Sequence, residues 1–330
     1  MGRGAGSRSA WPGRGSIPRV TDAFPIDQLL GLLDLERRPG DVFVGTSRDV
    51  AYTRIFGGQV AAQALVAAGR TVDPERYVHS LHAYFLRPGD PGHEVEFHVE
   101  RIRDGRGFSV RRVLAHQHGK VTFAMTASFH LPEAAPIRHT TRAPEVPDPE
   151  SLPALRDLLR AHVEELPPIL VDVTLPVDLR PVRGLGQRLV SWWGEVLADH
   201  PTQQGGGDYP GEDVVWFRAD GPMPDDPLLH VCVAAYLSDA TLLDAVQRRH
   251  GFHVGSGDLE VASLDHAMWF HRPYRADEWT LYVTQSPAAD RGLGFARGRM
   301  FDTHGELMVS ITQEGLFRRA TAPGQPLARG

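Results

Sequence analysis

The sequence has few of the residues that crosslink a chain or attract nucleic acid. Cys232 is the single cysteine among 330 residues, which excludes an intrachain disulfide framework and a cysteine-based zinc site. Basic residues are not in excess, because 41 acidic against 35 basic residues give a net charge of −6 and no overall positive field for phosphate backbones. We therefore expect a protein of a reducing, cytoplasmic compartment that does not bind nucleic acid.

Long hydrophobic runs and cofactor motifs are also missing. The longest strongly apolar stretch, 228–237, is about half of what a transmembrane helix needs, so we expect no membrane span. The sequence has no glycine-rich dinucleotide fingerprint, no Walker sequence and no Gly-x-Ser-x-Gly elbow of a serine α/β-hydrolase. On strands, His79 and His82 point to opposite faces, and His116 and His118 flank an exposed turn. We expect no cofactor and no metal.

The first half of the chain reads as an α+β unit. Apolar residues recur at helical spacing at 26–33, and a second helix at 56–68 has a face of small residues that suits close packing on a sheet. Alternating runs predict a short strand at 41–46 and long strands at the four segments 78–86, 94–103, 108–117 and 121–130. One helix against several antiparallel strands is therefore expected.

Residues 131–153 separate this unit from the rest of the chain. They are rich in proline and charge, which is typical of a linker between compact units. The sequence predicts a flexible tail, a first domain, a linker that contains a helix, a second domain and a second tail, at residues 1–20, 21–133, 134–167, 168–320 and 321–330 respectively.

The second half repeats the first with a shift of 185 residues. Residues 79–88 then align with 264–273, both ending in Arg-Pro, and Gly107 aligns with Gly292. A repeat of this length indicates a duplicated domain and not a solenoid. The helix of the second copy is expected at 228–237.

Several separated segments carry a resemblance to a known family. They are Phe-Gly-Gly-Gln at 56–59, Tyr-Phe-Leu-Arg-Pro-Gly-Asp at 84–90, Arg-Asp-Gly at 103–105, Phe-Ser-Val-Arg-Arg at 108–112, Met-Thr-Ala-Ser-Phe at 125–129, Leu-Asp-His-Ala-Met-Trp-Phe-His-Arg-Pro at 264–273 and Gln-Glu-Gly at 313–315. In this order they resemble the acyl-CoA thioesterase II family. The resemblance covers most of 26–133 and 168–318, whereas the first tail has no counterpart and the stretch 184–212 is longer than is usual for the family.

The resemblance implies a fold, an activity and an assembly. The fold is a tandem, or double, hot-dog, in which two long antiparallel sheets each wrap around a central helix. The activity is hydrolysis of fatty acyl-CoA to free fatty acid and coenzyme A, and the assembly is a homo-oligomer. Neither the acyl chain length nor the order of the oligomer follows from the sequence.

The resemblance also implies three catalytic residues in the second half. The family's acid lies in a Ser-Asp pair after the second helix, here Ser238 and Asp239, its hydroxyl residue is here Ser263, and its amide is here Gln313. A carboxylate can accept a proton from water while a hydroxyl and an amide orient that water, and a thiolate leaves without a strong acid. Whether water attacks directly or Asp239 first forms a covalent acyl intermediate stays open.

Other interpretations stay open beside this one. By residue type alone, Asp239 is better explained as the cap of a helix at 240–247. Gly58 and Gln59 are weaker candidates for substrate binding, because close helix packing explains a glycine there at least as well. An enoyl-CoA hydratase or dehydratase on the same fold would use His266 in place of Gln313, and a non-catalytic module would bind acyl-CoA without cleaving it.

Overall fold

The computed structural model describes residues 24–47, 54–134, 136–160, 175–183, 211–250, 252 and 259–320. The predicted tails at 1–20 and 321–330, and nearly all of the 184–212 segment, lie outside these residues. The predicted domain boundaries stay a prediction.

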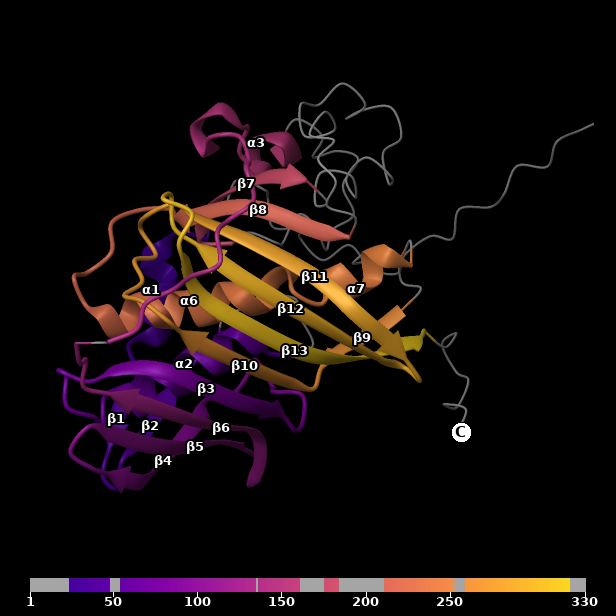
Figure 1. Ribbon diagram of the computed structural model, residues 1–330. Coiled ribbons are helices and arrows are strands. Elements are labelled where there is room, and N and C mark those ends of the chain that lie inside the picture. The colour runs from indigo at the N-terminus through magenta and orange to yellow at the C-terminus, as the bar shows by residue number, and fades with distance from the viewer. Residues whose placement is uncertain are drawn as a thin grey trace, which may run out of the picture.

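The first half folds into the elements that its hydrophobic pattern predicts, and the helices and long strands begin and end close to the expected positions (Figure 1). The short strand β1 was not expected, because its residues are half-buried or exposed and carry no apolar signal. The elements are α1 (Ile26–Leu33), β1 (Glu36–Arg38), β2 (Val42–Gly45), α2 (Gly57–Gly69), β3 (Tyr77–Phe85), β4 (Val95–Asp104), β5 (Phe108–Gln117) and β6 (Lys120–His130).

The second half contains the same kinds of element. They are η1 (Pro149–Ser151), α3 (Leu155–Arg160), β7 (Val177–Arg183), β8 (Glu212–Ala219), α6 (Pro227–Thr241), α7 (Asp244–Arg249), β9 (Leu259–Ser263), β10 (Asp265–Phe270), β11 (Thr280–Asp290), β12 (Leu293–Phe301) and β13 (Leu307–Arg319).

The helix predicted at 228–237 is α6, and it continues to Thr241. Asp239 therefore lies inside the last turn of α6 and does not cap a helix at 240–247. The start of that helix and its cap were wrongly predicted: Leu242 keeps helical dihedral angles, and α7 begins only at Asp244 with no side-chain cap. The reason is that buried apolar side chains, including Leu237 and Leu242, continue through the expected break and hold the last turn of α6 against the core.

The strands form one sheet, whereas the family resemblance implies two. Its strand order is β1-β2-β4-β5-β6-β3-β10-β13-β12-β11-β8-β7, with β9 paired to β13. An antiparallel ladder between β3 and β10 joins the halves, which leaves neither strand as an open edge. His82 pairs with Ala267 in this ladder, and these two residues are equivalent in the sequence repeat. The order on one side of the ladder thus mirrors the order on the other.

The two long helices pack against each other behind this sheet (Figure 1). Every residue of α2 from Gly58 to Ala68 is buried, and so is every residue of α6 from His230 to Ser238, among them Cys232. Helices that are buried all round form the centre of a core, and the apolar core here is continuous across both halves. Within the described residues, the stretch Pro227–Arg249 is long and apolar enough to span a membrane, yet 72% of its most apolar window is buried inside the fold.

Candidate active site

The three residues that the family resemblance singles out meet in the structure. Gln313 Nε2 donates a hydrogen bond to Asp239 Oδ1 at 2.5 Å, and Ser263 Oγ donates to the same oxygen at 3.3 Å. Asp239 comes from α6, Ser263 from the end of β9 and Gln313 from the middle of β13. Two neutral donors, one from β9 and one from β13, therefore converge on one carboxylate oxygen of α6.

Strand pairing explains how β9 and β13 bring their side chains to this point. Ser263 pairs with Gly315, two residues beyond Gln313 on β13. Because side chains alternate along a strand, Gln313 faces the core like Ile311, and it is fully buried. Tyr282 Oη of β11 donates to the Ser238 carbonyl oxygen at 2.9 Å and so holds the last turn of α6 against β11. Residue types alone gave no signal for this tyrosine.

The first half of the chain supplies the opposite wall of the site. A Cβ atom placed on Gly57 would lie 2.7 Å from Asp239 Oδ2 and 2.8 Å from the ring of Phe85. Gly57 is the first residue of α2, so the carboxylate lies at the helix end that carries partial positive charge. The helix N-terminus that stabilises the negative charge of Asp239 is therefore that of α2, in the first half of the chain. It is not that of the helix predicted directly after Asp239.

Gly58 and Gln59 lie next to this wall but make other contacts. A Cβ atom on Gly58 would lie 2.3 Å from the carbonyl oxygen of Tyr236, so the glycine allows α2 to approach α6 closely. Gln59 Nε2 donates to Ser47 Oγ at 3.1 Å and to the Thr46 carbonyl oxygen at 3.3 Å. These contacts are structural, and a substrate-binding role for either residue stays a prediction.

His266 lies behind the site. It is 1% exposed, and its Nε2 atom is 2.8 Å from Ser238 Oγ. Burial lowers the pKa of His266, against the opposing effects of the Asp239 charge and the Gln313 amide, so the imidazole is neutral at pH 7. Its Nε2 atom is engaged with Ser238 and, unlike Ser263 Oγ and Gln313 Nε2, makes no contact with the Asp239 carboxylate among the hydrogen bonds of the described residues.

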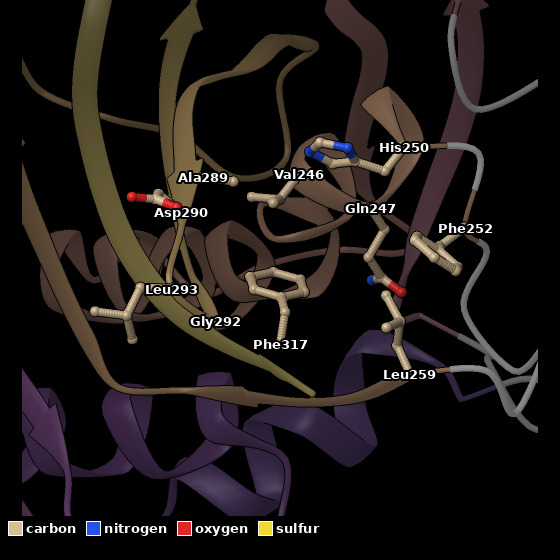
Figure 2. Close-up of a pocket in the computed structure, with 10 residues that line it drawn as sticks. All are labelled: Val246, Gln247, His250, Phe252, Leu259, Ala289, Asp290, Gly292, Leu293 and Phe317. Carbon is tan, nitrogen blue, oxygen red and sulfur yellow. The ribbon is translucent and has the colours of Figure 1, made fainter. Parts of the chain in front are cut away.

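A pocket of about 220 Å³ lies farther along β13 (Figure 2). Phe317 of β13 reaches into it and, by strand alternation, is on the same face as Gln313. Leu243 lies over Gly315, which is between Gln313 and Phe317 on this face, because a Cβ atom on Gly315 would lie 2.6 Å from the Leu243 Cδ1 atom. The lining is mostly apolar and consists of Val246, Gln247, His250, Phe252, Leu259, Ala289, Asp290, Gly292, Leu293 and Phe317.

Solved structures give the class of protein to which this fold belongs. A protein of Alicyclobacillus acidocaldarius described as having a hot dog fold matches with a TM-score of 0.67 at 20% identity, over 90% of this chain and 98% of its own. The acyl-CoA thioesterase II TesB2 of Mycobacterium marinum matches with a TM-score of 0.68 at 41% identity, over 91% of this chain and 100% of its own. The fold is a hot-dog fold of the thioesterase class.

Sequence comparisons define the family. Residues 190–316 match the model described as acyl-CoA thioesterase, and residues 46–130 match the acyl-CoA thioesterase N-terminal domain. Human acyl-coenzyme A thioesterase 8 is 36% identical over 331 aligned residues, which cover 96% of this chain and 94% of that protein. The chain belongs to the acyl-CoA thioesterase family. The predicted family resemblance and the predicted enzyme class, an acyl-CoA thioesterase, are confirmed. The comparisons favour this class over the hydratase and over the non-catalytic binding module.

Proposed function

We propose that this protein hydrolyses fatty acyl-CoA to a free fatty acid and coenzyme A, through a water molecule held by Asp239, Ser263 and Gln313. The observation that carries the proposal is the convergence of the Ser263 hydroxyl and the Gln313 amide on Asp239 Oδ1. These three groups come from segments that only the folded chain brings together, and one of them is a fully buried amide. Such an arrangement is suited to orienting a single small nucleophile.

The chemistry follows from the groups present. Asp239 accepts a proton from the water as its oxygen attacks the thioester carbon, and the Ser263 and Gln313 side chains hold that water in line. The first N–H groups of α2, at Gly57 and Gly58, have no intrahelical acceptor and can stabilise the oxyanion. The C–S bond then breaks, and coenzyme A leaves as a thiolate that takes up the proton.

A direct test measures thiol release from acyl-CoAs of graded chain length by the purified full chain. We expect turnover with at least one length class. If no length gave thiol release above the uncatalysed rate, the proposed function would be wrong. Binding of every acyl-CoA without cleavage would contradict the proposal in the same way.

Three further properties are part of the proposal. The mirrored strand order about β3 and β10, with one buried helix on each side, supports a tandem pair of hot-dog units sharing one sheet. A homo-oligomer rests on the family resemblance, and light scattering of the purified protein would test it. A cytoplasmic location rests on the single buried cysteine.

Replacing Ser263 by alanine is expected to lower kcat about 10- to 150-fold, because a hydrogen bond to a charged group contributes about 1.5–3 kcal/mol. Ser263→Thr keeps the hydroxyl and should retain most of the activity. Steady-state assays of the two variants side by side provide the measurement. Equal loss in both variants would mean that the size of the side chain, and not its hydroxyl, is what matters.

We further propose that the apolar pocket receives the end of the acyl chain and that Leu243 limits its length. Phe317 lies four positions after Gln313 on β13, which is roughly 13 Å along the shared face. Leu243→Ala is expected to shift the preference toward longer chains, with kcat/KM rising about fourfold for each added methylene that becomes buried.

Leu242→Ala is the matched control for this variant. Leu242 is equally a buried leucine of the same segment, so its loss creates a similar packing defect. Its chain-length profile should keep the wild-type shape even if overall activity falls. An unchanged profile in Leu243→Ala, or the same shift in both variants, would contradict the assignment of the pocket.

A further inference from the structure

Two histidines and a carboxylate converge on the surface of the first half. Asp90 and His93 lie in the loop between β3 and β4, and His118 lies in the turn between β5 and β6. Asp90 Oδ2 is 2.9 Å from His93 Nδ1 and 3.0 Å from His118 Nε2, and one ligand atom from each residue lies within 4.8 Å of the other two. We call these three residues the Asp90 cluster. His118 is 25 residues away from His93 in the sequence and meets this loop only in the folded chain.

Buried Gln117 holds the loop in shape. Its Nε2 atom donates to the carbonyl oxygens of Asp90 at 2.9 Å and His93 at 3.0 Å, and its Oε1 atom accepts from the Asp90 amide at 2.8 Å. The Gly92 amide donates to Asp90 Oδ1 at 2.9 Å, which leaves Oδ2 facing both imidazoles. The Gly92 amide and then His118 lower the pKa of Asp90, so the carboxylate is ionised at neutral pH. The loop is thus preorganised before any ligand binds.

The backbone at His118 is also unusual. His118 and Gly119 have φ angles of 50° and 69° and form the two-residue connection between β5 and β6. Such connections favour asparagine, aspartate or glycine at both positions. Histidine is among the residues that tolerate this left-handed conformation, which directs the imidazole of His118 against Asp90 and His93, with ring centroids 4.5 Å apart for the two histidines.

We propose that the Asp90 cluster binds one divalent cation of the zinc class, with Asp90 Oδ2, His93 Nδ1 and His118 Nε2 as protein ligands. Imidazole and carboxylate groups are ligands that such ions accept. Zinc bonds of about 2.0–2.2 Å place tetrahedral ligand atoms roughly 3.3 Å apart, close to the separations of 2.9 and 3.0 Å around Asp90 Oδ2. Each neutral imidazole then carries its proton on the other nitrogen, and since both side chains are more than half exposed, water completes the coordination.

The cluster is connected to the wall of the active site. The Ile55 amide donates to the Gly89 carbonyl oxygen at 2.9 Å, and the Ile55 side chain packs on Gly89. Ile55 lies two residues before Gly57, which contacts Asp239. A cation that links the loop to the β5–β6 turn would therefore stabilise the segment that leads into α2.

The experiment titrates the full, untagged, chelator-treated chain with zinc chloride in a calorimeter and follows its thermal unfolding with and without zinc. We expect saturable binding at one site and a higher Tm with zinc. His118→Asn keeps a residue that tolerates the left-handed backbone and should weaken this binding about tenfold or more and remove most of the Tm shift. His93→Gln should do the same.

His98→Asn is the matched control. His98 is another exposed histidine of this sheet, 3.1 Å from a Glu96 oxygen and with its ring 4.6 Å from that of His116. Its loss should leave zinc binding unchanged. Absence of saturable binding, or equal affinity in wild type, His93→Gln and His118→Asn, would overturn the proposal. Neither readout uses thioester hydrolysis, so failure of one proposal does not affect the other.

Discussion

Asp239→Asn is expected to lower kcat by about 10² to 10⁴, the contribution typical of a positioned general base. Asparagine keeps the shape of the side chain and an oxygen for the Ser263 and Gln313 donors, so the local structure should persist. What is lost is the ability to accept the proton of the attacking water. KM for acyl-CoA should change little, because substrate binding does not use this carboxylate charge.

Asp73→Asn controls for the loss of one negative charge. Asp73 accepts a hydrogen bond from the Glu75 amide in the turn after α2, away from the three residues. The Asp73→Asn variant should retain wild-type kcat. Circular dichroism should give the same spectrum for Asp73→Asn and Asp239→Asn. An Asp239→Asn variant with undiminished kcat would remove Asp239 from the mechanism and leave the site without a base.

Gly58→Ala is expected to destabilise the fold by about 3 kcal/mol or more, the upper end of what overpacking costs. The added Cβ atom would lie 2.3 Å from the Tyr236 carbonyl oxygen and 2.6 Å from the Phe56 ring, and the carbonyl belongs to the backbone of α6. The clash can be relieved only by moving α2 away from α6. Thermal unfolding should show a Tm lower by roughly 6 °C or more, and activity should fall because the two helices build opposite walls of the site.

Gly31→Ala makes the same substitution in an open position. Gly31 lies inside α1, and no atom of the described part of the chain comes within 4 Å of an added Cβ atom there. Alanine should therefore stabilise this helix by about 0.5–1 kcal/mol. Opposite signs of the two Tm shifts would confirm that contact between the helices, and not helix propensity, constrains Gly58. Two shifts of the same sign would argue against it.

Local patterns predicted most of the elements because their signals come from neighbouring residues. The alternation in β4 and the small residues of α2 indicate a strand with one wet face and a helix that packs closely. The same signals failed to predict the end of α6, which depends on tertiary packing. Asp239 looked like the cap of a new helix, yet buried leucines carry α6 past it. The strand β1, with no apolar residue to bury, had no detectable signal.

The candidate site was predicted in part. Asp239, Ser263 and Gln313 followed from the family resemblance, and their meeting at one carboxylate oxygen is a finding of the structure. Residue types gave no warning that Gly57, from the other half of the chain, would lie against Asp239. A contact between positions 182 residues apart leaves no pattern in the local sequence, because it depends on how α2 and α6 pack against each other and the sheet.

By itself, the sequence determined the α+β plan, the places of the central helices and strands, and the residue types available for hydrolysis, because hydrophobic periodicity is a property of neighbours along the chain. Only the tertiary structure decided that the repeats share one sheet through β3 and β10, that α2 provides the helix terminus beside Asp239, and that His118 meets Asp90 and His93. These features depend on long-range pairing and close packing, which are set when the whole core closes.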